Sequence, residues 1–386
     1  MQIVFSDAQY WEDFLPLTFT RPTAEMRCGI LTFRERWVKL LGIEEAAYIT
    51  ELYLQEKFVE PKSEECLLLV PNFLPSEKVL AQIKELKMGE ALVYENEVVA
   101  AHLNMNNFSL NQIEKMTDIE EELLFFKQPT DLFSYNEKAI NFDFDLLTNG
   151  RKSQELSSTN GFLGDSNDIF IEEGAQIEFS TLNARTGKIY IGRNAEVMEG
   201  CHLRGPIALC EESKFNLGAK VYGPTTIGPH SKVGGEVNNL VIFGYTNKGH
   251  DGFVGNSVIG EWCNLGADTN SSNLKNNYAS VKLWNYKSKR FVDTGLQFAG
   301  LIMGDHSKTA INTQLNTGTV VGVAANIFKS GFPPNLVENF SWGGMKGDEK
   351  FNLKKAYEVA EKAMGRRKIE LTEADKNIIK HIFDTY

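Results

Sequence analysis

The fold of this chain is decided by residues 187–233, which read GKIYIGRNAEVMEGCHLRGPIALCEESKFNLGAKVYGPTTIGPHSKV. Large apolar side chains recur at every sixth position of this stretch: Ile191, Val197, Leu203, Leu209, Phe215, Val221, Ile227 and Val233. A six-residue spacing fits neither an amphipathic helix nor a strand that alternates sides at every residue. It is typical of hexapeptide β-helices, in which short strands wind into triangular coils and one apolar side chain per strand points inward.

The same spacing continues outside this stretch. It appears at Ile171 and Ile177, resumes at Phe253, Ile259 and Leu265, and returns at Met303, Thr309, Leu315, Val321 and Ile327. We therefore predict a β-helix over residues 169–335. Residues 234–252 and 273–300 interrupt the spacing, so we expect both to leave the coil as loops, which is where binding and catalysis are often placed on a rigid scaffold.

The regions that flank the repeats have different patterns. Residues 1–150 alternate short apolar runs with a helical pattern over 76–87, for which Ser76 is a plausible N-cap, so we predict an α/β domain. Residues 151–168 are polar and rich in Gly and Ser, which predicts a linker. Residues 349–386 predict two helices, the second opening with a capping-box-like pair, Thr372 and Asp375.

Composition narrows the possible functions. A net charge of −11 over 386 residues argues against a protein whose main role is to bind nucleic acid. The first residues lack the layout of a signal peptide, and no apolar run approaches the roughly 18 residues of a membrane span. The five cysteines form no CxxC pair, so we expect a reducing, cytoplasmic location. From the net charge and the lack of long apolar runs we expect neither a nucleic-acid partner nor a membrane partner.

Two residues in and near the first interruption could carry chemistry. His250 lies in the string NKGHDGF, and an imidazole with a pKa near 6.5 suits a general base that deprotonates an amine. The alternative is a loop histidine bonded to a backbone carbonyl. Lys220 sits beside a repeat position and points away from the core, so it is either a solvated surface charge or a phosphate ligand. The asparagines around His250 are either turn formers or groups that hold sugar hydroxyls.

Near the N-terminus, Arg21 and Arg27 precede a predicted helix. They could hold a triphosphate against the helix N-terminus, or they could be incidental charges of an exposed turn. His202, His230 and His306 lack the spacing of a metal-binding histidine pair, so we predict no metal ligands among them. The chain also contains neither a nucleophile elbow nor a P-loop string.

Several strings resemble a known family. LPLTFTRPTAEMRCGI (15–30), YGPTTIGP (222–229), KVGGEV (232–237), NKGHDGFVGNSVIGEWCNLGA (247–267) and LKNNY (274–278) are similar to the bifunctional uridyltransferase/glucosamine-1-phosphate acetyltransferases, in the alternative form of Bacteroidetes-type bacteria. The resemblance implies a left-handed coil, against the usual hand of crossovers. It also implies a homotrimer with acetyl-transfer sites between subunits, acetyl-CoA as cosubstrate, and Mg²⁺ with UTP or another NTP at the N-terminal domain.

The resemblance also implies roles for single residues. His250 matches the acetyl-transfer base, Lys220 falls where the common enzyme has a phosphate-binding arginine, and Asn238 falls at a second phosphate contact. Phe253 replaces a sugar-site tyrosine. Asn264 matches a sugar-binding asparagine, and Asn273 matches an asparagine beside the thioester.

The N-terminal domain departs from the family pattern. Pro22 is followed by Thr23 rather than a lysine, the glycine-rich loop is absent, and the central strand ends in Asn72 where a metal-binding aspartate is usual. Arg21 and Arg27 would then serve as replacement triphosphate contacts.

The combined prediction is a cytoplasmic N-acetyltransferase that acts on glucosamine 1-phosphate, followed by uridylyl transfer to give UDP-N-acetylglucosamine for cell-wall synthesis. One alternative is a hexose-1-phosphate nucleotidyltransferase, thymidylyl or uridylyl, whose β-helix serves assembly or regulation. A third possibility is a trimeric scaffold that only binds sugar nucleotides.

Overall fold

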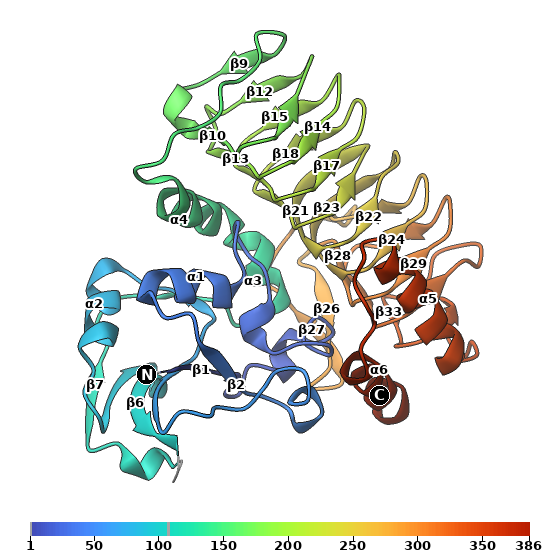
Figure 1. Cartoon of the computed structure of the whole chain (residues 1–386). Helices are drawn as coiled ribbons and strands as arrows, with labels where there is room; N and C mark the ends of the chain where they lie inside the picture. Colours follow the sequence, from blue (N-terminus) through green and yellow to red (C-terminus); the bar gives the residue numbers. More distant parts are fainter. Residues whose placement is uncertain (1, 106–108) are drawn as a thin grey trace.

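The computed structural model describes residues 2–105 and 109–386, which form an α/β domain, a long β-solenoid and a pair of C-terminal helices (Figure 1). The predicted order of an α/β domain, a parallel β-helix and short helices is confirmed. In the described part of the chain, no helix is both long and apolar enough to cross a bilayer.

The α/β domain is built on a six-stranded mixed sheet with strand order β2-β1-β3-β6-β5-β7. Its strands are β1 (Gln2–Ser6), β2 (Ala46–Ile49), β3 (Glu65–Leu69), β5 (Glu90–Tyr94), β6 (Glu97–Asn104) and β7 (Lys115–Asp118); β4 (Phe73–Leu74) pairs separately with β8 (Leu124–Phe125). The domain's helices are α1 (Phe33–Leu41), α2 (Glu77–Glu85), α3 (Pro129–Ser134) and α4 (Asn136–Thr148). Ser76 caps α2 as predicted, because its hydroxyl accepts from the amide of Val79.

The solenoid has three faces, each made of parallel strands from successive coils. The docking face consists of β10 (Ile169–Ile171), β13 (Ile189–Ile191), β16 (Ile207–Leu209), β19 (Thr225–Ile227), the ends of β21 (Glu236–Gly244) and β23 (Phe253–Glu261), β28 (Leu301–Met303), β31 (Thr319–Val321) and β33 (Leu336–Val337). The groove face consists of β9 (Gly161–Leu163), β12 (Thr181–Asn183), β15 (His202–Arg204), β18 (Lys220–Tyr222), the starts of β21 and β23, β25 (Asn270–Ser271) and β30 (Gln314–Leu315).

The third face, which we call the outer face, is a nine-stranded sheet. It consists of β11 (Gln176–Ile177), β14 (Glu196–Val197), β17 (Lys214–Phe215), β20 (Lys232–Val233), β22 (Asn247–Lys248), β24 (Asn264–Leu265), β29 (Lys308–Thr309), β32 (Asn326–Ile327) and β34 (Trp342–Gly343). The left hand of the coil stays a prediction.

The residues of the six-residue spacing fill the solenoid interior, as predicted. All eight apolar positions from Ile191 to Val233 are buried in one core. One predicted position is wrong: Val254, not Phe253, joins this core. Since side chains alternate along a strand, Phe253 points outward from the groove face.

The first interruption is not a loop, which corrects our expectation for residues 234–252. β21 and β22 continue the coil through it. Ile227 pairs with Ile242, only 15 positions later, whereas Leu209 pairs with Ile227, 18 positions later. This coil has fewer residues in its corners, but its strands still pair with those of the neighbouring coils. The six-residue spacing in the sequence is therefore interrupted where the coil itself is continuous.

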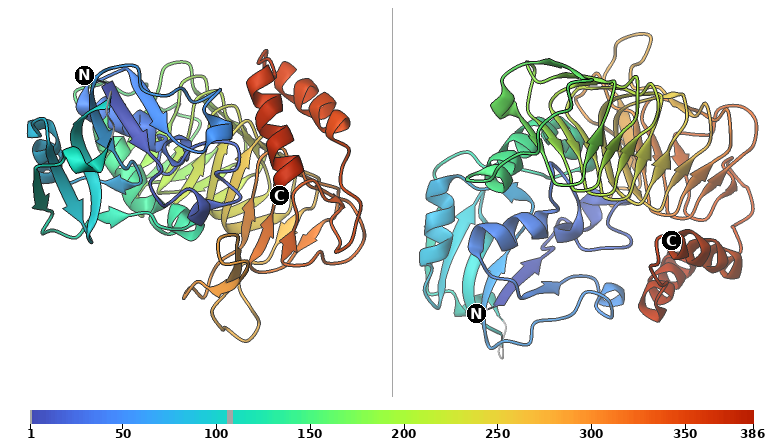
Figure 2. Two further views of the ribbon diagram at one scale, coloured as in Figure 1. Left: turned by 90° about the horizontal axis from the view of Figure 1, so that it is seen from below. Right: turned by 45° about the horizontal axis from the view of Figure 1, so that its top comes forward.

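The second interruption does leave the coil, as expected. Within residues 273–300, β26 (Lys282–Asn285) and β27 (Arg290–Asp293) form an antiparallel hairpin that extends from the body of the molecule (Figure 2, left). The base of the hairpin packs against the α/β domain, because Val281 and Leu283 belong to the hydrophobic core that includes that domain. An ion pair of 3.1 Å between Lys287 and Asp13 adds a polar contact.

The solenoid extends past the predicted limits of 169 and 335. β9 lies within the stretch predicted as a linker and pairs with β12, and β34 continues the outer face to Gly343. The helices α5 (Leu353–Gly365) and α6 (Glu373–Thr385) lie between the last coils and the α/β domain (Figures 1 and 2). Their apolar sides pack with Trp262 and Phe340 of the solenoid and with Leu54 of the α/β domain.

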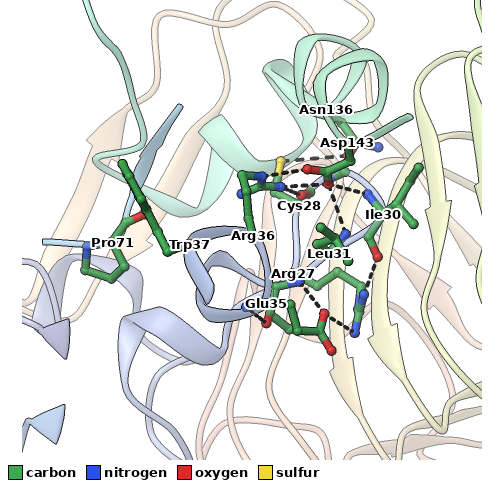
Figure 3. A network of polar contacts seen from close by, with 12 residues as sticks. Arg27, Cys28, Ile30, Leu31, Glu35, Arg36, Trp37, Pro71, Asn136 and Asp143 are labelled. Atoms are coloured by element: carbon green, nitrogen blue, oxygen red, sulfur yellow. Dashed lines mark hydrogen bonds and ion pairs between the residues drawn. The ribbon is translucent and has the colours of Figure 1, made fainter. Parts of the chain in front are cut away.

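The α/β domain is fixed to the docking face by apolar contacts and a buried polar network (Figure 3). Arg36 of α1 and Asp143 of α4 form an ion pair of 2.7 Å and are both fully buried. The same carboxylate accepts from the amides of Ile30 and Leu31, which fixes the loop before α1 within the α/β domain. Two side chains beside this network reach the solenoid: Arg27 Nε donates to the carbonyl oxygen of Phe243 at 3.1 Å, and Asn136 Nδ2 donates to that of Pro224 at 2.9 Å.

Candidate functional site

Of the six residues that the resemblance assigns to the acetyl-transfer site, three lie on the groove face, namely Lys220, Asn238 and Phe253, and Asn273 lies beside it. Lys220, Glu236 and Phe253 are partners in register on three successive coils, and Asn238 lies in the neighbouring column. Val221, Val237 and Val254 between them are buried in the core, so the site residues point outward. Coils stack at about 4.8 Å, which places Lys220 and Phe253 about 10 Å apart along the face.

Asn273 closes this group at the start of the second interruption. Its side-chain amide donates to Asn256 Oδ1 at 2.8 Å. A Cβ placed on Gly255 would lie 2.7 Å from Phe253 Cζ and 2.8 Å from Asn273 Nδ2. The phenyl ring and the amide therefore converge above Gly255, and the missing side chain lets them approach each other.

His250 lies on the corner between the outer face and the groove face. It is exposed, and its corner, residues 249–252, leads directly into Phe253. The corner is held from inside by Lys248, whose Nζ donates to the carbonyl oxygen of His250 at 2.6 Å. The imidazole is thus attached to a fixed backbone and is open to a substrate. The role of the imidazole stays a prediction.

Asn264 lies on the other side of this corner. It belongs to β24 of the outer face, where its Oδ1 accepts from Asn247 Nδ2 at 2.9 Å. The structure therefore separates Asn264 from the groove face, and within one chain the His250 corner stands between the two.

A groove of about 610 Å³ lies on the groove face, and Lys220 is at one end of it. Its polar lining includes Thr181, Asn183, His202, Arg204, Tyr222 and Glu236. Lys220 makes an ion pair of 3.5 Å with Glu236, whose carboxylate also accepts from the Tyr222 hydroxyl at 2.7 Å. Burial and this hydrogen bond raise the pKa of Tyr222 to about 12, so its hydroxyl stays a donor at neutral pH.

His202, Arg204 and Tyr222 were not assigned to this site from the sequence. His202 is the register partner of Lys220, 18 residues earlier, and Arg204 lies 18 residues before Tyr222. Counting one full coil back from Lys220 finds His202, and Arg204 is found by the same count from Tyr222. The result is a row of basic groups beside Lys220, which suits an anionic substrate group.

Arg21 and Arg27 lie elsewhere, at a cavity of about 330 Å³ where the α/β domain, the solenoid and the C-terminal helices meet. Arg21 is 5% exposed, forms ion pairs with Asp305 and with Glu261 (3.2 Å), and stacks over Phe243. Arg27 is 7% exposed and pairs with Glu35 at 3.4 Å (Figure 3).

Two roles were expected for Arg21 and Arg27, as triphosphate contacts or as incidental charges of an exposed turn. The structure excludes only the second. The two arginines are not charges of an exposed turn, because both guanidinium groups are buried and paired. The helix N-terminus that follows them is already capped by Thr32 and Glu35. A triphosphate would have to displace these carboxylates, and a nucleotide role for Arg21 and Arg27 stays a prediction.

Comparison with known proteins identifies the N-terminal part. Residues 2–152 match a family model described as sugar nucleotidyl transferase, and the match covers the whole α/β domain. This region is a nucleotidyltransferase-like α/β domain.

Two curated relatives combine this activity with a second one. The chain is 32% identical over 144 residues to a bifunctional sugar-1-phosphate nucleotidylyltransferase/acetyltransferase of Sulfurisphaera tokodaii, covering 37% of this chain and 35% of the relative. It is 40% identical over 87 residues to the bifunctional protein GlmU of Methanocaldococcus jannaschii, covering 22% and 21%. The chain thus spans about a third or less of the relatives' length.

The residues that the N-terminal domain offers near its central strands can be described without a bound metal ion. Across residues 2–105 and 109–386, no three His, Cys, Asp or Glu side chains are grouped to hold a metal ion. Asn72 is fully buried, and its amide donates to the carbonyl of Phe126 at 2.6 Å. Asp7, at the end of β1, accepts from the amide and hydroxyl of Thr23, and burial raises its pKa to about 6.

Proposed function

We propose that the solenoid transfers the acetyl group of acetyl-CoA to the amine of an amino-sugar 1-phosphate, most specifically glucosamine 1-phosphate. The observation that carries this proposal is the placement of His250 on a held, exposed corner directly beside the outward-facing row of the groove face. A base, a phosphate-binding cation and two amides are thereby offered to one ligand. The match to bifunctional relatives supports the same reaction class.

The proposed chemistry is direct transfer. His250 takes a proton from the neutral substrate amine as its nitrogen attacks the thioester carbonyl, which forms a tetrahedral intermediate. The Asn273 amide and nearby backbone N–H groups donate to the oxyanion. Collapse of the intermediate forms the amide bond and breaks the C–S bond, and the CoA thiolate takes up the proton from His250.

Lys220 fixes the sugar phosphate in this scheme. With His202 and Arg204 beside it, the ammonium provides an anion-binding row on the groove face, and an anchored phosphate holds the amine near the thioester. In the structure Lys220 forms an ion pair with Glu236, so a bound phosphate would replace the Glu236 carboxylate as the partner of the ammonium. Phe253 would contact the sugar ring, and Asn238 would be a second contact of the phosphate.

The groove face is open in a single chain, which is why we propose a homotrimer in which a neighbouring copy completes the site. Asn264, on the far side of the His250 corner, would then serve the site of an adjacent pair of subunits. All five cysteines are buried free thiols, which fits the proposed cytoplasmic location.

A second activity is proposed for the nucleotidyltransferase domain, because its family match is independent of the solenoid. It would transfer a nucleotide, uridylyl in the main proposal, to the acetylated sugar phosphate with release of pyrophosphate. UDP-N-acetylglucosamine would be the product of both steps, and cell-wall precursor synthesis its use.

The substrates are tested by separating the two assays. We expect acetylation of glucosamine 1-phosphate, detected by mass spectrometry, and much slower acetylation of glucosamine, which lacks the phosphate for Lys220. Pyrophosphate release with N-acetylglucosamine 1-phosphate and either UTP or dTTP tests the second activity. Pyrophosphate release without any acetyl transfer would favour the alternative of a nucleotidyltransferase with a structural solenoid.

A further inference from the structure

A buried lysine lies directly beneath the His250 corner. Lys248 ends β22, and only 2% of its surface is exposed. Its register partner one coil earlier is Val233, an interior residue of the solenoid. An ammonium in an aliphatic interior is costly unless its protons are hydrogen-bonded, so its presence requires a structural reason.

Backbone carbonyl groups accept hydrogen bonds from the Lys248 ammonium. Lys248 Nζ donates to the carbonyl oxygens of Gly234 (2.9 Å), His250 (2.6 Å) and Asp251 (3.4 Å). These are three acceptors for the three protons of an ammonium, and hydrogen bonds from a charged donor are roughly twice as strong as neutral ones. Lys248 therefore ties the corner that carries His250 to the corner of the preceding coil.

Corner length explains why this tie is placed here. Two residues, 234–235, connect Val233 to Glu236, whereas four residues, 249–252, connect their register partners Lys248 and Phe253. The longer corner overhangs the shorter one, and it contains two glycines. A Cβ on Gly235 would lie 2.9 Å from the carbonyl oxygen of His250, so the two corners are in close contact.

A second side chain completes the attachment. Asn216 Nδ2 donates to the carbonyl oxygen of Gly249 at 2.7 Å. The three successive carbonyls of residues 249–251 thus each accept from a side chain that approaches from inside or below. The imidazole of His250 is left on the outside of a corner whose backbone is fixed.

We propose that Lys248 is the positioning residue for His250: its ammonium holds the corner so that the imidazole faces the groove face at Phe253. Lys248 itself touches neither substrate nor the reacting atoms. This inference rests on the proposed role of His250 as base, and it makes Lys248 matter for turnover rather than for substrate binding. A displacement of about 1 Å in a catalytic group can cost on the order of 10² in rate.

The test compares four variants of the full-length chain. Lys248→Met keeps the length of the side chain but removes all three donors, and Asn216→Ala removes one bond from the edge of the corner. Lys214→Met is the matched control, because Lys214 lies on the same face, two coils earlier, and pairs with Glu196 rather than with the corner. His250→Ala gives the rate without the base. Amide hydrogen exchange of residues 249–252 is measured beside kcat and KM.

For Lys248→Met we expect faster exchange at residues 249–252 and a kcat about 10-fold or more below wild type, with each KM within about 3-fold, as positioning without binding requires. Asn216→Ala should show smaller changes of the same kind, and Lys214→Met should match wild type in both. If Lys248→Met does not fold, Asn216→Ala decides the question.

Two results would overturn the inference. Unchanged exchange at residues 249–252 would show that Lys248 does not hold the corner, whatever the activity. Faster exchange with wild-type kcat would show that the corner's position does not matter. Failure of the proposed function would look different, since His250→Ala would then retain wild-type turnover.

Discussion

At the scale of single residues, several ionisable groups in this chain are buried by the packing of loops against strands. Asp7 is 5% exposed and accepts hydrogen bonds from Thr23 and from the Thr50 hydroxyl. Burial outweighs these bonds and raises the pKa of Asp7 from 3.8 to about 6. The native state therefore holds this proton more tightly than the unfolded chain does.

This difference predicts a pH dependence of stability. The contribution of Asp7 is fully present below about pH 3.8 and is lost as the pH rises through about 6. Two pKa units correspond to about 3 kcal/mol. Asp7→Asn does not titrate, so the unfolding free energy of wild type minus that of Asp7→Asn should fall by about 3 kcal/mol between pH 4 and pH 7. Urea denaturation at several pH values measures this difference, and a constant difference would contradict the assignment.

At the scale of elements, the solenoid shows what the sequence could and could not predict. The inward positions were predictable because each coil must bury an apolar residue on every face, and this requirement repeats along the chain. The shortened coil at residues 234–242 was not, since deletions at corners shift the spacing while the strands stay paired. That slip also led us to place Phe253 inside, although it points outward to the groove face.

The candidate site was predictable to a similar degree. Lys220 could be expected to face outward because its neighbour Val221 occupies a repeat position. Arg204 and Tyr222 could be assigned to the same site only with the number of residues per coil, which no single position in the sequence reveals. The burial of Arg21 and Arg27 could not be predicted, because their partners Asp305 and Glu35 depend on how the domain docks and how α1 is capped.

The contact between the loop that carries Thr20 and Arg21 and the solenoid at Asp305 gives a prediction at the scale of elements. Asp305 pairs with Arg21, accepts from the Thr20 hydroxyl at 2.7 Å and accepts from the amide of Glu261 at 2.8 Å. Asp305→Ala leaves the buried guanidinium of Arg21 with Glu261 as its remaining ion-pair partner, so we expect a loss of about 3–5 kcal/mol.

The matched control is Lys380→Ala, which breaks an exposed pair with Asp384 on α6 and should cost at most about 1 kcal/mol. Both losses are measured by urea denaturation at neutral pH. Equal effects of the two substitutions would show that the Arg21 pair does not contribute to docking.

At the scale of the whole molecule, the three parts form one continuous structure. The core of the α/β domain includes residues of the docking face, and the C-terminal helices contact both other parts. The groove face is left open, with a groove of about 610 Å³ that ends at Lys220 and Glu236, and His250 is exposed on the corner that leads into this face. An open face on a long solenoid is the reason to expect a symmetric assembly.

The expected assembly is a trimer. Sedimentation equilibrium should give a mass close to three times the 43.4 kDa of the chain. Glu236→Lys places a second cation beside Lys220 and tests whether the open face is in the interface, because like charges there would weaken association. A monomeric wild type at micromolar concentration would contradict the proposal of sites completed between subunits.

The central claim is that His250 acts as the base in acetyl transfer. It is tested most directly by the release of free CoA thiol from acetyl-CoA in the presence of glucosamine 1-phosphate, with wild type compared with His250→Ala. The account predicts release that depends on the sugar phosphate and falls by roughly 10² or more in the variant, which should fold normally because His250 is exposed. Thiol release at the wild-type rate from His250→Ala, or none from folded wild type, would contradict it.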